Sequence, residues 1–275
     1  MSDWMILNGQ LVEGGEVALG VKDPGLAYGF GVFETIRFRK GKACFLREHS
    51  ERLMRAMREA GISGTLSLED LEVWARRLFE ANEVEEGIFK VIASSVCEGT
   101  KIAVFVRDVG LSSEVKPMRL RVSEICKSSL AFTSRHKTTN YIENLLELGK
   151  AKADGFDECL FRNEKEEITE CCMSNFCFAV DGVLQVPSID CGLLDGIARM
   201  KILEAAPTIG LEVNEGRFSI EDLGKASEAF VSNSGAGTVS IESIHSKEIE
   251  FRFPETKLAD RLRKEIERLE EEAFA

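Results

Sequence analysis

The chain has 275 residues, enough for one large domain or two modest ones with a sizeable core. Its formal net charge of -12 argues against a nucleic-acid partner, because phosphate backbones bind to basic surfaces. No apolar run approaches the ~20 residues that a membrane span needs, and MSDWMILNGQ lacks the pattern of a signal peptide. We therefore expect a cytoplasmic protein with no nucleic-acid partner and no membrane partner.

The eight cysteines are scattered, and several lie in apolar runs where cysteine behaves as a small hydrophobic residue. We expect them to be reduced. A zinc site needs closely spaced ligand pairs, whereas this chain has only the adjacent Cys171 and Cys172 and three isolated histidines. The sequence therefore predicts no metal site.

Short apolar runs separated by glycines fill residues 6–38 and predict strands joined by tight turns. Within them, DPGLAYGFGVFETIR places Gly29 and Gly31 where the backbone could pass close to another group. Tyr28 and Phe33 could line a pocket there. A glycine-rich hairpin with aromatic residues in the core explains the stretch equally well.

Residues 45–62, FLREHSERLMRAMREAGI, predict an amphipathic helix because apolar residues recur at helical spacing. His49 and Arg52 share one face near its start, where an arginine and spare backbone N–H groups suit a phosphate. A solvated charged face is the alternative, and the segment alone favours it. A second helix, over residues 67–83, begins with a capping-box pattern, and its apolar stripe is expected to pack in the core.

Residues 87–96 and 101–109 predict paired strands. The stretch that follows, Val109–Pro117, is polar, free of periodicity and ended by proline, which is typical of an interdomain linker. The sequence therefore predicts two α/β domains, residues 1–115 and residues 116–275.

Lys137 lies in SRHKTTNYIE, between a strand-like segment and a helix predicted over residues 138–155. A lysine in such a position, with Tyr141 one turn on, could hold an aldehyde cofactor as an imine. A surface lysine is the simpler interpretation of the segment alone. The residues of the helix that are expected to face the core are Ile142, Leu145, Leu146 and Gly149.

Residues 158–163 and 167–180 predict two further strands, and the second continues through an Asp-Gly turn into VLQVPS. Glu170 falls within that second strand, where an acid is unusual unless a cationic group pairs with it. A glutamate that faces solvent is the alternative.

Two later segments could each bind an anion through backbone N–H groups. LLDG leads into a helix with Ile197 and Ala198 in its first turn. The strand EAFVSN ends in SGAG, where the small residues Ser234 and Gly235 begin a turn whose backbone could curl around an anion. Each segment alone is weak evidence.

Taken together and in this order, the segments resemble the class IV (fold type IV) pyridoxal-phosphate-dependent enzymes. That family includes branched-chain aminotransferases, D-amino acid aminotransferases and aminodeoxychorismate lyases. The resemblance covers nearly the whole chain and rests on YGFGVFETIR, H-x-x-R, HKTTNY, ITECCMSNFCFAVDGVLQVPS, LLDGIAR and EAFVSNSGAGTVSI. It implies an α/β fold with a small N-terminal and a larger C-terminal domain, with pyridoxal 5'-phosphate between them.

The resemblance also implies roles for individual residues. Lys137 would form the Schiff base and move the proton at the substrate Cα, and Glu170 would pair with the pyridine nitrogen. Tyr28 and Phe33 would line the substrate side. The implied cofactor-binding residues are Arg52, Tyr141, Glu170, Ser174, Asn175, Ile197, Ala198, Ser234 and Gly235.

The implied reaction is amino transfer between an amino acid and a 2-oxo acid, in a homodimer. A lyase that releases 4-aminobenzoate and pyruvate from aminodeoxychorismate is the alternative, and a non-catalytic binding relative is a second one. The presence of Lys137, Arg52 and Glu170 argues against the last. Two departures from the family pattern are Ala198, where threonine is common, and the lack of a substrate-binding arginine from Lys90 to Glu98.

Overall fold

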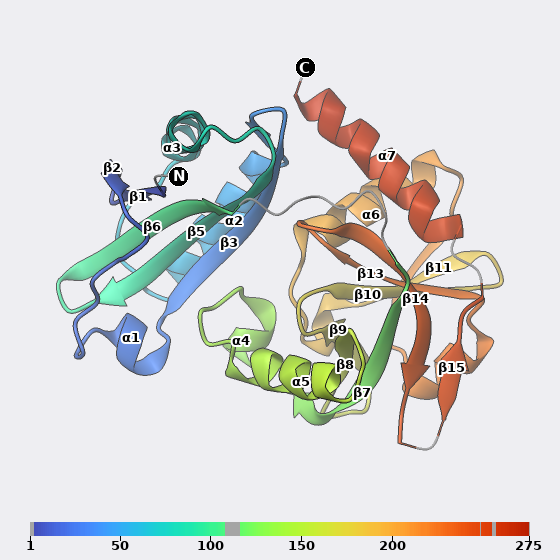
Figure 1. The fold of residues 1–275 in the computed structure, drawn as a ribbon. Coiled ribbons are helices and arrows are strands. Elements are labelled where there is room, and N and C mark those ends of the chain that lie inside the picture. Colours follow the sequence, from blue (N-terminus) through green and yellow to red (C-terminus); the bar gives the residue numbers. More distant parts are fainter. Residues whose placement is uncertain (1–2, 108–115, 248, 255–256, 275) are drawn as a thin grey trace. The chain divides into compact units, whose positions relative to one another are not determined.

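The structure, a computed structural model, describes residues 3–107, 116–247, 249–254 and 257–274. Both halves of the chain combine helices with strands, so the predicted α/β class is confirmed. Nearly all of the predicted linker lies outside the described residues, and the boundary after residue 115 stays a prediction. Two compact units are formed, one by Met1–Ser112, His136–Asn140 and Ala273–Ala275 and the other by Ser113–Arg135 and Tyr141–Glu272 (Figure 1).

The first unit is built on a six-stranded antiparallel sheet in the order β2-β1-β6-β5-β3-β4. Two helices, α2 and α3, pack on one face of it, and a short α1 precedes β3. The elements are β1 (Trp4–Leu7), β2 (Gln10–Glu13), α1 (Pro24–Tyr28), β3 (Gly31–Arg39), β4 (Lys42–Ala43), α2 (Leu46–Glu59), α3 (Leu68–Asn82), β5 (Gly87–Val96) and β6 (Gly99–Arg107).

Strand β3 sets the pattern of this core. Its side chains alternate, so that Val32, Glu34, Ile36 and Phe38 are buried while the residues between them are only half-buried. The buried members face the helices, where Phe38 stacks on Phe79 of α3 with ring centroids 4.0 Å apart. An acid, Glu34, therefore shares the apolar face of the strand.

The second unit contains a nine-stranded sheet in the order β12-β11-β10-β13-β14-β7-β8-β9, with β15 paired to β14. Because β9 also pairs with β10, part of the sheet closes into a barrel. Its strands are β7 (Met118–Lys127), β8 (Glu158–Asn163), β9 (Ile168–Cys171), β10 (Asn175–Val180), β11 (Val183–Pro187), β12 (Val213–Gly216), β13 (Glu228–Asn233), β14 (Gly237–His245) and β15 (Glu250–Arg252).

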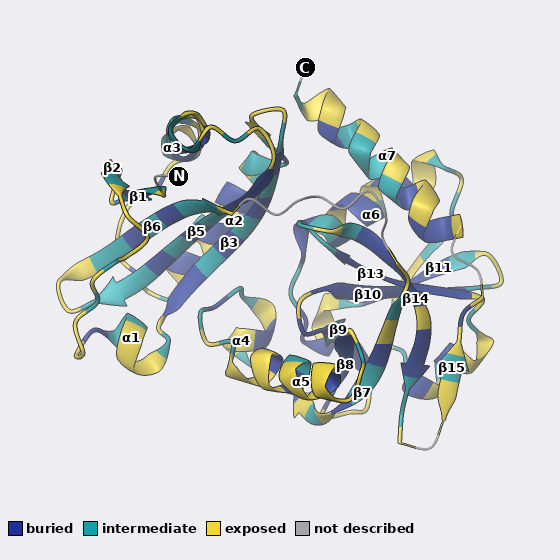
Figure 2. Cartoon of the chain, in the orientation of Figure 1, coloured by how far each residue is buried: buried dark blue, intermediate teal, exposed yellow. Residues whose placement is uncertain are grey.

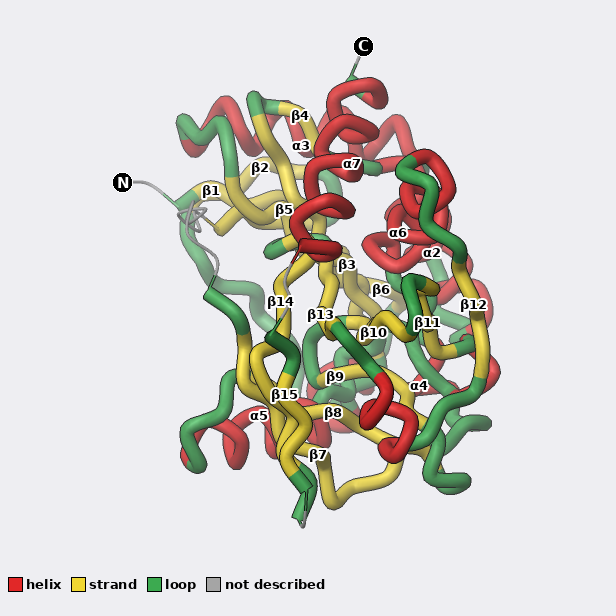
Figure 3. Tube along the Cα trace, turned by 90° about the vertical axis from the view of Figure 1, so that its right-hand side faces the viewer, coloured by secondary structure: helices red, strands yellow, loops and turns green. Residues whose placement is uncertain are grey.

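Helices α6 (Ile197–Thr208) and α7 (Lys257–Ala273) lie side by side on the outer face of this sheet (Figures 1 and 3). Ile202 of α6 and Leu262 of α7 share one buried cluster with Phe230 of β13. The barrel interior is filled separately by apolar side chains of its strands, including Phe176 and Phe178. Across the described ranges, no helix combines the length and the apolar character needed to cross a membrane.

Helices α4 (Phe132–Arg135) and α5 (Ile142–Ala153) complete the second unit, and the expected core face of α5 is wrong. Ile142, Leu145 and Leu146 are 72%, 58% and 50% exposed, and Figure 2 shows exposed residues along this helix. The buried face carries Asn144, Glu147 and Ala151 instead. Long-range polar contacts, invisible to a periodicity argument, decide which face is inside.

Two hydrogen-bonded groups hold that polar face. The Asn144 side chain accepts from Lys127 Nζ at 2.7 Å and donates to the Cys172 carbonyl at 2.7 Å. Glu147 accepts from the Ser123 hydroxyl at 3.0 Å and from Lys150 Nζ at 2.7 Å. Buried polar groups are tolerated when they are paired in this way.

Candidate active site

The segment that carries Lys137 belongs to the first unit, although α4 and α5 on either side of it belong to the second. It runs antiparallel to the start of β3 through an isolated bridge between Val32 and Thr138. The Phe33 N–H donates to the Lys137 carbonyl at 2.9 Å, and the Thr139 N–H donates to the Gly31 carbonyl at 2.9 Å. The backbone of Lys137 is thus fixed by the edge of a sheet.

Side chains anchor the same segment at both ends. The Thr139 hydroxyl donates to the Gly29 carbonyl at 2.7 Å, and His136 Nε2 lies 3.1 Å from the carboxylate of Glu59 on α2. A Cβ at Gly31 would stand 2.9 Å from both Thr139 Oγ1 and the Ala93 carbonyl. The glycine at position 31 is therefore required by the close approach of this segment, as its motif predicted.

Phe33 lies against two lysines. Lys137 Nζ is 4.6 Å from the centroid of the Phe33 ring, and Lys90 Nζ, from β5, is also 4.6 Å from it. Burial lowers the pKa of Lys90, and the charge of Arg107 adds to this. Among the described residues, no carboxylate pairs with Lys90.

Arg52, predicted to bind phosphate, is held by a carboxylate that the sequence analysis did not single out. Its Nε and Nη2 donate to the two oxygens of Glu34, each at 2.7 Å. His49 Nδ1 lies 2.7 Å from the same carboxylate. All three side chains are buried, which makes this a desolvated, bidentate ion pair of the strong kind.

The charges within this cluster follow from burial and pairing. Burial alone would raise the pKa of Glu34, but the charges of Arg52 and His49 outweigh it and hold the pKa well below its usual range. Burial lowers the pKa of His49, and Glu34 offsets this only in part. Arg52 therefore balances the charge of the buried Glu34 carboxylate.

Glu170 is placed in the second unit by β9, as the motif predicted, and its carboxylate meets the segment before α6. Its Oε2 accepts from the Leu194 N–H at 3.1 Å and from Asn175 Nδ2 at 3.5 Å. Asn175 Nδ2 also donates to the Leu194 carbonyl at 2.9 Å. Asn175 thus ties Glu170 to the start of the next helix.

Helix α6 begins at Ile197 with Gly196 as its N-cap, and none of the side chains that the structure describes caps it. The first-turn amides of Ile197 and Ala198 are therefore not capped by a side chain, as the sequence predicted. A side chain at position 196 would collide with Asn175, whose Oδ1 lies 1.9 Å from where a Cβ would stand. Glycine is needed here for packing between the helix start and β10.

The turn after β13 differs from its expected form. The Gly235 N–H, expected to face an anion, donates instead to Asn233 Oδ1 at 2.9 Å, and the Ala236 N–H does so at 2.7 Å. An asparagine that bonds its own backbone two and three residues on takes over these amides. Within the described residues, the Ser234 hydroxyl has no hydrogen-bond partner.

The remaining predicted residues occupy varied positions. Ser174 is buried beside Glu158, Tyr141 is the half-buried N-cap of α5, and Tyr28 is 77% exposed at the end of α1. The structure brings Lys137, Phe33 and Arg52 into one unit. The predicted residues of the other unit are Tyr141, Glu170, Ser174, Asn175, Ile197, Ala198, Ser234 and Gly235.

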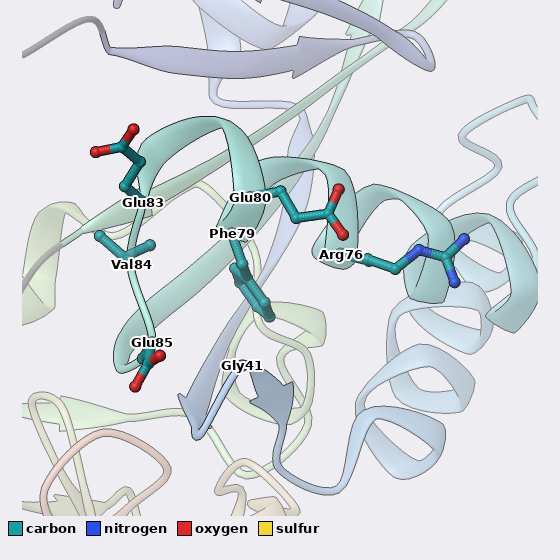
Figure 4. A pocket seen from close by; sticks show the side chains of 7 residues that line it. All are labelled: Gly41, Arg76, Phe79, Glu80, Glu83, Val84 and Glu85. Atoms are coloured by element: carbon teal, nitrogen blue, oxygen red, sulfur yellow. The ribbon is translucent and has the colours of Figure 1, made fainter.

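None of the predicted site residues lines a hollow of about 460 Å³ in the first unit (Figure 4). It is formed where the end of α3 faces Gly41 in the turn between β3 and β4, and Phe79 points into it. Three glutamates and one arginine make it unsuited to a phosphate. Its lining residues are Gly41, Arg76, Phe79, Glu80, Glu83, Val84 and Glu85.

Comparison with known proteins gives consistent results. The model of the family described as "Amino-transferase class IV" matches residues 31–244. The chain is 30% identical to the aminodeoxychorismate lyase of Bacillus subtilis (strain 168), over 83% of this chain and 82% of that protein. It is 26% identical to a D-alanine aminotransferase of Listeria monocytogenes serotype 1/2a (strain 10403S), over 83% of each.

A solved structure resembles the whole chain. The branched-chain aminotransferase of Thermoproteus uzoniensis, solved with norvaline, superposes with a TM-score of 0.89 and 24% identity, over 98% of this chain and 95% of that one. At this identity the likeness concerns the fold.

Replacement of Glu34 by alanine should destabilise the protein strongly, because it leaves the buried Arg52 guanidinium without its counter-charge. Loss of one partner from a buried pair costs on the order of 3–5 kcal/mol. Urea unfolding of Glu34→Ala should be compared with that of Thr35→Ala, on the opposite face of β3. Equal free energies of unfolding for the two variants would contradict the ion pair.

Proposed function

We propose, given that the chain belongs to the pyridoxal-phosphate-dependent class IV aminotransferase family, that Lys137 is its catalytic lysine. The family and the enzymatic character expected from the motifs are confirmed by that membership, and pyridoxal 5'-phosphate is the cofactor it brings. The observation that carries the proposal is the rigid placement of Lys137 on the edge of β3 beside Phe33.

The described residues fit the chemical groups of this cofactor. An uncapped helix start at Ile197 and Ala198, with the unpartnered Ser234 hydroxyl, suits a phosphate dianion. The Glu170 carboxylate suits a protonated pyridine nitrogen, and the Lys137 amine suits an aldehyde. When bound, the cofactor supplies an electron sink for the charge that develops on the substrate.

The residues of this chain then have separate tasks. Lys137 holds the cofactor and carries the proton to and from the substrate Cα, which its flexible side chain can do because only its backbone is fixed. Glu170 keeps the pyridine nitrogen protonated, and Asn175 and the Leu194 N–H hold its carboxylate in place. Arg52, oriented by Glu34, is assigned to the phosphate as a hydrogen-bond donor.

Lys90 is proposed as the cation that meets a substrate carboxylate. Its ammonium is half-buried, lacks a carboxylate partner among the described residues and lies against the ring that Lys137 also contacts. A partly desolvated cation is costly without an anion nearby, so an anionic substrate group would stabilise it. This lysine would serve where the sequence analysis found no arginine.

Amino transfer between an amino acid and a 2-oxo acid is the reaction we favour, because the family model that matches residues 31–244 is that of the class IV aminotransferases. The lyase alternative is supported by the 30% identity to the Bacillus subtilis aminodeoxychorismate lyase. Purified protein should be assayed with glutamate and a panel of 2-oxo acids, beside aminodeoxychorismate. Pyruvate release without amino transfer would select the lyase. The absence of both activities would contradict the proposal.

Lys137→Ala should lower turnover by orders of magnitude, because the same amine anchors the cofactor and moves the proton. The variant should also lose the visible absorption band of the holoenzyme. Lys150→Ala, a lysine on α5, serves as the control and should keep both. A Lys137→Ala variant that retained full turnover would overturn the assignment.

Lys90→Ala should raise the KM of the anionic substrate about tenfold while kcat changes less, because a charge-assisted contact to a carboxylate contributes roughly 1.5–3 kcal/mol. Lys90→Arg should recover part of the loss. Lys101→Ala, on the neighbouring strand β6, is the control. An unchanged KM in Lys90→Ala would show that this ammonium does not contact the substrate.

A homodimer is proposed as the oligomeric state, with the exposed apolar face of α5 as part of the interface. Ile142, Leu145 and Leu146 form that face, and exposed apolar clusters of this kind mark association sites. A cytoplasmic location remains a proposal that rests on composition.

Light scattering should give the mass of two chains for the wild type and a shift toward one chain for Leu145→Glu. The charged side chain would be buried without a partner in the interface. Lys152→Glu, exposed on the same helix, should stay dimeric. A monomeric wild type would contradict the proposed dimer.

A further inference from the structure

Glu158 is a buried carboxylate that the proposed chemistry does not use. It opens β8 and is 4% exposed. Its two oxygens accept from the Met173 N–H and, at 3.0 Å, from the Ser174 hydroxyl. No basic side chain pairs with it in the part of the chain that the structure describes. A buried acid without a counter-ion is costly to the folded state.

The hydrogen bonds continue from Glu158 to the turn after β13. Asn233 Nδ2 donates to the Ser174 hydroxyl oxygen at 3.1 Å. Asn233 Oδ1 in turn accepts the Gly235 and Ala236 N–H groups. The carboxylate, one hydroxyl and one amide therefore form a single chain that ends in the turn that contains Ser234.

The donor and acceptor roles in these hydrogen bonds are fixed at both ends of the series. Two backbone N–H groups require the oxygen of Asn233 to face the turn, which points its NH₂ group at Ser174. Ser174 has one proton, and the acceptor for it is Glu158. If Glu158 ceased to accept, the Ser174 proton would need another acceptor. The Asn233 oxygen could accept it only if the amide reversed, and its NH₂ group would then face the Gly235 and Ala236 N–H groups.

The same turn lies close to the start of α6. Asn175, which packs against Gly196, is paired across the sheet with Ser232, two residues before Ser234. The Ser232 hydroxyl is buried without a hydrogen-bond partner in the described structure. The turn and the helix start thus converge on one polar region of the second unit.

We propose that Glu158 is a positioning residue for phosphate binding, which orders the turn at Ser234 through Ser174 and Asn233 without contacting the cofactor. This inference rests on the proposed function, because that function assigns the turn to the phosphate. It gives Ser174 a supporting part in the site in place of direct contact.

The ionisation of Glu158 is sensitive to its surroundings. Burial raises its pKa to about 7, although the hydrogen bonds from Met173 and Ser174 and the charge of Lys152 oppose the rise. The Cys171 and Cys172 thiols also face it, and Glu158 contributes to the raised pKa of each. The acceptor role that the chain of hydrogen bonds needs is therefore fully available only above neutral pH.

The test compares pyridoxal 5'-phosphate with pyridoxal, which lacks the phosphate. Dissociation constants are measured on the full-length chain, freed of cofactor, for the wild type, Glu158→Gln and Asn233→Ala. Both variants should weaken pyridoxal 5'-phosphate about tenfold, the effect of about one hydrogen bond to a charged group, and pyridoxal less than twofold. Asn233→Ala provides the answer if Glu158→Gln fails to fold.

Glu147→Gln is the matched control, because Glu147 is a buried glutamate of the same unit. It bonds Ser123 and Lys150 and takes no part in the hydrogen bonds that link Glu158 to the turn. It should affect both ligands equally. Equal weakening of both ligands by Glu158→Gln, or none, would overturn the inference. A wild-type protein that bound neither ligand would instead refute the proposed function.

Discussion

The short pairing between β3 and the segment that carries Lys137 is the constraint on which the candidate site depends. Two backbone hydrogen bonds, Phe33 N–H to Lys137 carbonyl and Thr139 N–H to Gly31 carbonyl, hold the lysine on one strand edge. Because the side chains of β3 alternate, Phe33 meets Lys137 on one face while Glu34 binds Arg52 on the other. One strand thus places both groups.

The buried carboxylates of Glu34 and Glu158 are stabilised in different ways, and they make the stability of the protein depend on pH in opposite directions. Arg52 keeps Glu34 ionised, so that pair contributes stability above the unfolded pKa of about 4.5 that is lost as the pH falls. The pH dependence of the Glu158 contribution to stability has the opposite sign. Because its pKa is raised, Glu158 favours the folded state at low pH, and this contribution is lost as the pH rises to about 7. Glu34 therefore keeps its charge near neutral pH, whereas the charge of Glu158 changes there.

The fold class could be predicted from motifs, and so could the strand that holds Glu170 and the helix start at Ile197, because these are local features of the sequence. Glu34 was also within reach, since period-two alternation places it among Val32, Ile36 and Phe38. The buried face of α5 was not, because it is set by Lys127 and Cys172, distant in sequence. The same holds for the joining of residues 136–140 to the first unit.

Site mapping after borohydride reduction shows whether Lys137 carries the cofactor. Borohydride treatment of the holoenzyme should fix the cofactor covalently, and digestion with mass spectrometry should place it on the peptide that contains Lys137. We expect that peptide to be the labelled one. Labelling of another lysine, such as Lys90 or Lys150, would contradict the account.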